Sequence, residues 1–207
     1  MSTNLIETVP DQTVVLSLKI TGIAPLLMHA PTLIDPLHPL TKEMQKHTSK
    51  GSKKTIADQE RIARIEWEAG LYWDDDLGPF LPTTNLTGAL KKAGGRYKLG
   101  AAVSRGVTFA TTRLPIQYDG PKDRDGLYEA GFRDTRPVKN GGFNSGRVMR
   151  TRPCFQAWVI EATMHVNPHE IGVEDLARVV ADARRYGLGD YRPEFGLFDA
   201  ELYEVES

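Results

Sequence analysis

The chain has 207 residues, of which 40% are hydrophobic and 26% charged, as expected for a globular protein with one buried core. A single cysteine, Cys154, excludes a disulfide framework and a cysteine-ligated zinc site. The first residues lack the features of a signal peptide, and no apolar run approaches the roughly 20 residues that span a bilayer. We therefore expect a cytoplasmic protein.

The net charge is −1, but the charged residues are unevenly distributed. Residues 77–118 and 135–157 contain several Lys and Arg and no Asp or Glu, and residues 42–54 are rich in lysine. Acids accumulate from Glu161 to the C-terminus. Each basic cluster alone fits a solvated surface equally well, but three together favour a polyanion as the partner.

Apolar periodicity and turn residues predict six core elements in the order strand, helix, strand, strand, helix, strand. This order is that of a ferredoxin-like, RRM-like βαββαβ fold, of the α+β class, and we expect it to form a single domain over residues 1–207. The six elements, in chain order, are 13–21, 84–94, 107–118, 153–166, 173–186 and 196–205.

Two insertions interrupt this core, at residues 22–83 and 119–152. Within the first, the polar residues 42–54 are expected to form a mobile loop, and residues 55–69 an amphipathic helix. The second is rich in glycine and proline, and we expect an excursion from the core.

The sequence gives little support for a catalytic function. No Gly-x-Ser-x-Gly elbow is present, Cys154 lies in a strand pattern, and the five histidines lack zinc-binding spacing. The glycines fit neither a dinucleotide fingerprint nor a Walker loop, and the run 74–76 is more typical of a solvated acidic turn than of a Mg²⁺ site. We expect no enzyme activity, no bound metal and no cofactor.

Residues that suit a phosphate chain flank the end of the first core helix. Lys91 and Lys92 precede Gly94 and Gly95, where the backbone can approach a ligand closely, and Arg96 and Lys98 follow. A glycine helix cap flanked by solvated lysines is an equally good interpretation.

The segment KNGGFNSGRVMRTRP, residues 139–153, carries a more specific signal. Phe143 offers a surface for base stacking, and Arg147, Arg150 and Arg152 are expected on one side if the segment is extended. The alternative is a plain β-hairpin with a solvated face.

Several segments resemble a known family. GPFLPTTNLTGALKKAG resembles the entry to the first helix in the RAMP superfamily of CRISPR-associated proteins, and YGLGDYRPEFGLF resembles that superfamily's glycine-rich loop before the last strand. With its two insertions, the chain is similar to the backbone subunits of multisubunit CRISPR effector complexes. PLLMHAPTLIDPL, KKTIADQERIARIEWEAGLYW and GRVMRTRPCF also resemble a family of uncharacterised bacteriophage proteins.

The resemblance implies an RRM-like fold, a thumb-like second insertion and polymerisation along single-stranded RNA. It also implies strand contacts from the loop 187–192. Asp190 departs from the superfamily pattern because it places an acid among these glycines; either Arg192 compensates or the loop serves packing alone. Some RNA-cleaving backbone subunits use an acid in the loop after the first strand, and Asp35 is the nearest candidate.

We therefore predict a non-catalytic protein that binds single-stranded RNA or DNA and self-assembles along it as a homo-oligomer or helical filament. One alternative is a phage-encoded interaction factor that mimics or inhibits a CRISPR effector subunit, located in the host cytoplasm. Another is a RAMP-type endoribonuclease using Asp35. The predicted nucleic-acid-binding residues are Thr84, Asn85, Lys91, Lys92, Arg96, Lys98, Arg105, Arg136, Lys139, Phe143, Arg147, Arg150, Arg152 and Arg192.

Overall fold

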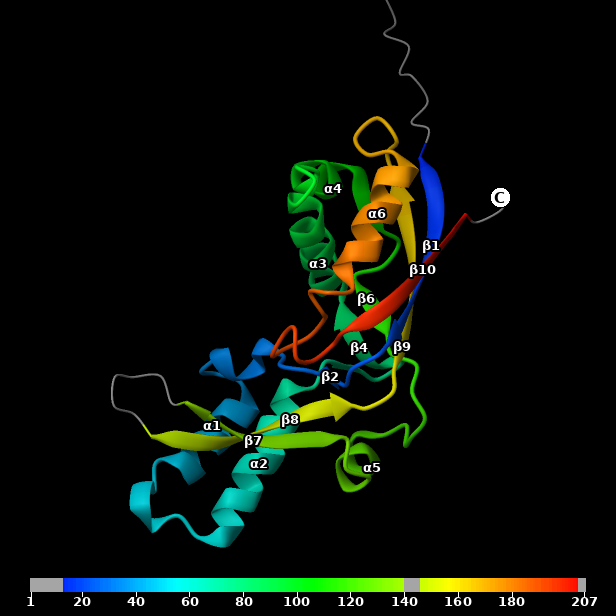
Figure 1. Ribbon diagram of the computed structural model, residues 1–207. Helices are drawn as coiled ribbons and strands as arrows, with labels where there is room; N and C mark the ends of the chain where they lie inside the picture. The colour runs from blue at the N-terminus through cyan, green and yellow to red at the C-terminus, as the bar shows by residue number, and fades with distance from the viewer. Residues whose placement is uncertain (1–12, 140–145, 205–207) are drawn as a thin grey trace, which may run out of the picture.

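A four-stranded antiparallel sheet forms the upper half of the molecule in Figure 1. The computed structural model describes residues 13–139 and 146–204 and orders the strands of this sheet β10-β1-β9-β5. The central strand β1 buries Leu16, Leu18 and Ile20 on one face, as its alternating pattern requires. The strands are β1 (Val14–Gly22), β5 (Val107–Phe109), β9 (Val159–Val166) and β10 (Phe198–Glu204).

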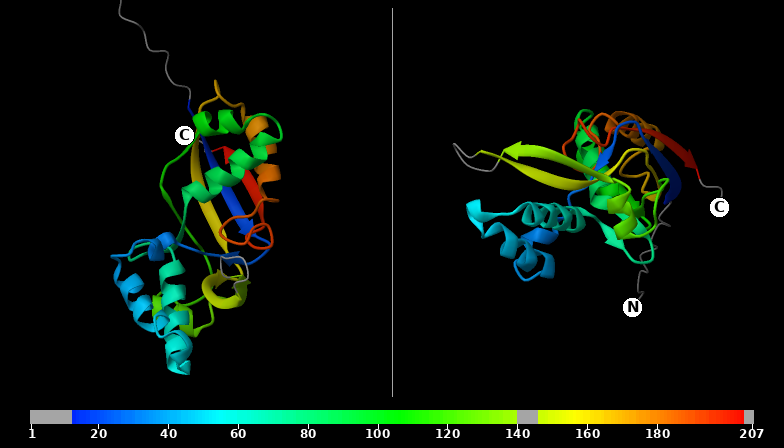
Figure 2. Two further views of the ribbon diagram at one scale, coloured as in Figure 1. Left: turned by 90° about the vertical axis from the view of Figure 1, so that its left-hand side faces the viewer. Right: turned by 90° about the horizontal axis from the view of Figure 1, so that it is seen from below.

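Helices α3 (Thr83–Gly95) and α6 (Val173–Ala183) cover the inner face of this sheet. The left view of Figure 2 shows the green α3 and the orange α6 in front of the strands. Both helices occur where the apolar periodicity predicts them, and α6 buries Leu176, Val179 and Val180. Helix α4 (Gly100–Gly106) follows α3 and leads into β5.

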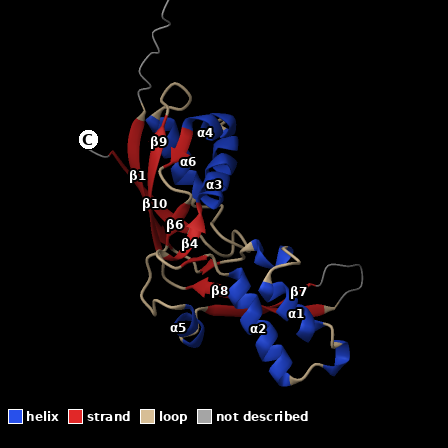
Figure 3. Ribbon diagram, turned by 180° about the vertical axis from the view of Figure 1, so that it is seen from behind, coloured by secondary structure: helices blue, strands red, loops and turns tan. Residues whose placement is uncertain are grey.

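The lower half contains a β-hairpin and a long helix that packs along it (Figures 1 and 3). The hairpin consists of β7 (Arg133–Lys139) and β8 (Arg147–Phe155), and β8 also pairs with β2 (Leu26–Leu27). The long helix is α2, which occupies the segment predicted to be helical and begins after the capping residue Thr55. The remaining elements are η1 (Pro31–Ile34), α1 (Pro39–Thr48), η2 (Gly51–Lys53), α2 (Ile56–Gly70), β3 (Trp73–Asp74), β4 (Gly78–Pro82), β6 (Arg113–Pro115) and α5 (Arg124–Glu129).

Aromatic side chains join the two halves into one core. The Phe155 ring lies 5.2 Å from Tyr118 and 5.4 Å from Phe132 between ring centroids. The Trp67 indole of α2 donates a hydrogen bond of 2.8 Å to the carbonyl of Phe132. The fold is therefore a mixed α/β arrangement of antiparallel sheets around a continuous core. No helix in the described ranges is long and apolar enough to cross a membrane.

Two predicted strands are wrong in their extent, because in each the chain changes neighbours part-way. Residues 107–118 divide into β5, which pairs with β9, and β6, which pairs with β4. Residues 153–166 divide into β8 and β9, and the break contains the buried Trp158, whose indole donates to the Ala24 carbonyl at 2.9 Å. The propensity of residues to form strands does not show where the chain exchanges one neighbouring strand for another.

The prediction of a mobile loop at residues 42–54 is also wrong, because α1 occupies its first half. Pro39 opens this helix, the His38 ring accepts from the Leu40 amide at 3.2 Å, and Met44 is buried. The second insertion contributes to the core as well, since the fully buried Leu127 lies on α5.

Asp58 connects α1, η2 and α2. Its carboxylate accepts from Lys50, from the Thr55 amide at 3.0 Å and from the His47 ring at 2.8 Å. These hydrogen bonds, the one from Lys50 most strongly, hold the pKa of Asp58 well below its ordinary 3.8. An Asp whose pKa is depressed by folding stabilises the protein above its ordinary pKa and loses that effect as the pH falls through the lower, folded value.

We expect Asp58→Asn to lower the free energy of unfolding by an amount that is constant above about pH 5. The difference from wild type should shrink progressively below about pH 4, because the Asp58 carboxylate of the unfolded wild type then takes up a proton while that of the folded protein stays ionised. Urea denaturation over pH 2–7 measures this, with Glu60→Gln, an exposed carboxylate of the same helix, as the matched control. A difference that does not change with pH would contradict the assignment.

Candidate nucleic-acid interface

The glycine loop, residues 187–196, has a backbone that only glycine accommodates at three positions. Gly187, Gly189 and Gly196 have φ of +67°, +75° and +70°. A Cβ on Gly189 would lie 2.3 Å from the Leu27 carbonyl oxygen, and one on Gly196 would lie 1.9 Å from that of Leu188. The glycines thus allow the loop to pack directly onto the β2 segment, where the Asp190 amide donates to the Leu27 carbonyl at 2.8 Å.

One face of the hairpin packs against the glycine loop. Because side chains alternate along a strand, Arg136, Arg150 and Arg152 share this face. The Arg136 guanidinium lies 4.3 Å from the Phe195 ring centroid, and the Arg152 guanidinium 4.9 Å from that of Tyr191. These contacts are cation–π interactions that fix the arginines beside the loop.

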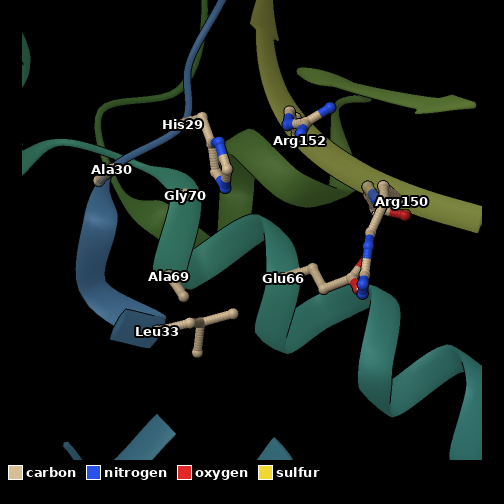
Figure 4. Close-up of a pocket in the computed structure, with 9 residues that line it drawn as sticks. His29, Ala30, Leu33, Glu66, Ala69, Gly70, Arg150 and Arg152 are labelled. Atoms are coloured by element: carbon tan, nitrogen blue, oxygen red, sulfur yellow. Dashed lines mark hydrogen bonds and ion pairs between the residues drawn. The ribbon is translucent and has the colours of Figure 1, made fainter. Parts of the chain in front are cut away.

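A pocket of about 240 Å³ lies between β8, α2 and the segment that follows β2 (Figure 4). We call it the arginine pocket; its polar lining comprises His29, Glu66, Arg150 and Arg152. Glu66 is buried, and its carboxylate accepts from the Thr151 amide at 2.9 Å and from Arg150. It therefore provides a hydrogen-bond acceptor for the edge of β8 in the part of the strand that β2 does not cover. It also neutralises Arg150, one of the two arginines.

Asp190 neutralises the other arginine. One carboxylate oxygen, Oδ2, lies 3.1 Å from Arg152 Nε and 3.5 Å from His29 Nδ1. Burial lowers the pKa of His29 from its ordinary 6.5, and the positive charge of Arg152 lowers it further. The His29 ring is therefore predominantly neutral at pH 7.

A second pocket, of about 710 Å³, opens on the other side of Asp190. We call it the helix pocket; Gly88 and Lys92 of α3 form one wall, and Tyr191 and Arg192 of the glycine loop form another. The Lys92 ammonium lies 5.1 Å from the Tyr186 ring centroid. The full lining is Gly88, Lys92, Arg185, Tyr186, Asp190, Tyr191, Arg192 and Pro193.

The structure brings part of the predicted site together. Lys92 and Arg192 meet in the helix pocket, Arg150 and Arg152 in the arginine pocket, and Arg136 lies against the loop between them. Thr84 and Asn85 lie in the first turn of α3, one turn before Gly88, and Lys91 is exposed on the same helix.

Other predicted residues lie elsewhere. At the far end of α3, Arg96 pairs with Asp182 at 3.4 Å, and on α4 Arg105 pairs with Glu170 at 2.8 Å. Lys98, also beyond the far end of α3, is exposed. Lys139 and Arg147 are paired at the end of the hairpin that borders residues 140–145.

Arg147 corrects one expectation about the thumb-like segment. It is separated from Arg150 by three positions and therefore projects from the opposite face of β8. Phe143, the predicted stacking residue, lies outside the described residues.

Asp35 occupies an exposed turn between η1 and α1. Its carboxylate accepts from the Leu37 amide at 2.8 Å. Asp74 likewise accepts from two amides of its own turn, Asp76 at 3.0 Å and Leu77 at 3.1 Å. Within residues 13–139 and 146–204, no three His, Cys, Asp or Glu side chains gather as a metal site requires.

Cys154 has no features of a nucleophile. Its side chain is buried with Leu27 and Phe195, and burial raises the pKa of its thiol to about 11. The thiolate that would act as a nucleophile is therefore scarce at neutral pH.

Sequence reasoning missed His29 and Glu66. Glu66 carried a usable signal, because it lies one helical turn after Ile62 on the apolar side of α2, where a charge needs a partner. His29 carried no local signal, since only the tertiary fold brings it to Arg152.

The outer face of the four-stranded sheet is acidic. Register places Lys19 between Glu201 of β10 and Glu161 of β9, and Thr21 beside Asp199. All three carboxylates are on exposed residues; Lys19 lies between two of them, and Arg184 pairs with Asp199 at 3.2 Å. This face is therefore less favourable for a polyanion than the helix pocket, where Lys92, Arg185 and Arg192 outnumber Asp190.

No family model and no curated protein matches the sequence. The structure, however, superposes on a chain of the cryo-EM structure of the Type III-B Cmr-beta bound to cognate target RNA, with a TM-score of 0.55 and 13% sequence identity. The match covers 93% of this chain and 61% of that chain, so this chain spans less than two thirds of the length of its neighbour. The two chains share a fold.

Gly189→Ala tests the packing of the glycine loop. A side chain at φ +75° costs about 1–2 kcal/mol, and the overlap with the Leu27 carbonyl adds to this, so we expect a loss of at least about 2 kcal/mol of unfolding free energy. The control is Gly88→Ala in α3, where the new Cβ meets open space and helix propensity favours alanine by about 1 kcal/mol. Urea denaturation compares the two; equal stabilities would contradict the packing argument.

Proposed function

We propose that this protein is a non-catalytic subunit that binds single-stranded RNA in an assembly like the CRISPR effector complexes. The observation that carries this proposal is the convergence of cations from distant parts of the chain. Lys92 of α3 and Arg192 of the glycine loop line the helix pocket together with Asp190, whose carboxylate lies 3.1 Å from Arg152 of the hairpin. Tyr191 adds an exposed aromatic ring beside them, suited to stacking on a base.

The arrangement of the strands supports a ferredoxin-like core of the RAMP type. Counting only the four strands of the main sheet in chain order, β10-β1-β9-β5 is the order 4-1-3-2, with α3 between the first two strands and α6 between the last two. In this interpretation the hairpin β7–β8 is the thumb-like insertion, and its arginine-bearing face lies over the core rather than in solvent.

RNA is favoured over DNA as the ligand, because the structural neighbour is a chain of a complex bound to RNA. We also propose that copies assemble along the strand by a head-to-tail contact. The acidic outer face of the sheet, with Glu161, Asp199 and Glu201, is complementary in charge to a basic surface of the next copy.

Fluorescence anisotropy with an unstructured, labelled RNA tests strand binding. We expect Lys92→Ala/Arg185→Ala/Arg192→Ala, which empties the helix pocket of cations, to weaken binding by about tenfold or more. It should also flatten the plot of log affinity against log salt by about 2, since each phosphate contact on a single strand contributes about 0.7.

The matched control is Arg96→Ala/Lys98→Ala/Arg105→Ala, which removes the same charge just beyond α3 and on α4, outside the lining of the helix pocket. Its affinity should stay within about threefold of wild type, because only long-range attraction is lost. Equal losses in the two triple variants would refute the proposed interface. Single-stranded DNA of the same sequence serves as the comparison ligand.

Light scattering coupled to size-exclusion chromatography tests assembly. We expect wild type to form multimers on an RNA of several tens of nucleotides, and Glu161→Lys/Glu201→Lys to bind RNA without forming them, because the acidic face is then reversed in charge. A wild type that stays monomeric with and without RNA would contradict the assembly.

A further inference from the structure

We propose that the Asp190 carboxylate occupies the position of a strand phosphate at Arg152, so that RNA must displace it in order to enter the arginine pocket. The inference rests on the proposed RNA binding and identifies the residue that regulates it. An acid here is unexpected in a phosphate-binding loop, and its surroundings explain what it does.

The Asp190 carboxylate already makes the contacts that a phosphate would make. Its Oδ2 lies 3.1 Å from Arg152 Nε and 3.5 Å from His29 Nδ1, both of which line the arginine pocket. Asp190 itself lines the helix pocket, so it stands at the boundary between the two cationic cavities. A strand passing from one pocket to the other must replace this carboxylate.

The ion pair is close but poorly directed. Although Nε and Oδ2 are 3.1 Å apart, the N–H does not point at the oxygen; Oδ2 and Arg152 Nη1 are both buried, and neither has a hydrogen-bond partner among the described residues. The contact is therefore weak as a hydrogen bond despite the short distance, because hydrogen-bond strength depends steeply on direction. Arg152 therefore keeps unused donors for an anion that can receive them in a bidentate manner, as phosphate does.

The backbone holds Asp190 in this competing position. Its amide donates to the Leu27 carbonyl at 2.8 Å, and its Oδ1 accepts from the Tyr191 amide at 2.9 Å. Gly189, immediately before it, has no space for a side chain. Since the loop cannot retreat, displacement must come from rotation of the Asp190 side chain, which can turn toward the solvent of the helix pocket.

Removal of the Asp190 charge should therefore strengthen RNA binding. We expect Asp190→Asn, which keeps the size and the oxygen acceptor of the side chain, to bind labelled single-stranded RNA about tenfold or more tightly than wild type. The salt dependence should become steeper by about 0.7, the contribution of one additional phosphate contact.

Glu194→Gln is the matched control, because Glu194 is an exposed acid of the same loop, 3.8 Å from Arg136. It removes the same charge without freeing Arg152, and we expect a gain of no more than about twofold. The gain from Asp190→Asn should disappear when Arg152→Gln is also present, since the arginine is the group that is freed.

The outcomes separate this inference from the proposed function. If wild type binds RNA and Asp190→Asn gains no more than Glu194→Gln, or keeps its gain without Arg152, the inference is overturned and strand binding stands. If only Asp190→Asn binds, the competition is supported in its strongest form. If neither protein binds RNA at low salt, both proposals fail.

Should Arg152→Gln fail to fold, the nitrogen chemical shift of Arg152 Nε in wild type replaces it. Addition of RNA must shift this resonance if a phosphate takes the place of the carboxylate, and Asp190→Asn must shift it in the absence of RNA. A resonance that stays unchanged in both experiments overturns the inference.

Discussion

The architecture of the site depends on backbone-to-backbone contact between the glycine loop and the β2 segment. Gly189 lies so close to the Leu27 carbonyl of β2 that a Cβ atom would overlap it, and Gly196 lies equally close to the Leu188 carbonyl within the loop. This contact positions Asp190 and Tyr191 beside the hairpin, and it positions Arg192 in the same pocket lining as Gly88 and Lys92 of α3. A greater distance between the loop and β2 would move the Asp190 carboxylate away from Arg152.

Charge is used in two different ways in this protein. At the far end of α3 and on α4, Arg96 and Arg105 pair with acids of neighbouring elements at the surface, an arrangement that contributes little to stability. Around the glycine loop, Arg136 and Arg152 pair with acids as well, with Asp134 and Asp190, but they also stack on aromatic rings. The helix pocket does hold an excess of cations, because its lining contains Lys92, Arg185 and Arg192 against the single acid Asp190.

Local patterns predicted much of the fold. Both core helices, the capped helix α2 and the strands at the two ends of the described chain could be located from apolar periodicity and glycine stops. The breaks inside residues 107–118 and 153–166 could not, because each depends on which strand lies alongside. Helix α1 was missed because its buried side is narrow: Met44 and Thr41 are its only buried residues.

The candidate site was predicted less completely, for a related reason. Basic composition identified Lys92, Arg150 and Arg152, and it equally identified Arg96 and Arg105, because composition does not report which cations will line a pocket. The decisive partners, Glu66 and His29, come from the insertion after β1 and reach β8 only through tertiary packing. A residue pattern within one segment does not show which distant residues the fold will bring beside it.

The acidic exterior of the main sheet has a geometric consequence. In the proposed assembly, a strand kept away from that exterior would run along the helical side, where the helix pocket lies. Every copy threaded on a common strand would then turn its helices inward and its sheet outward. Such a chain of subunits would have a defined inside and outside, and further proteins approaching it would meet the acidic face of the sheet.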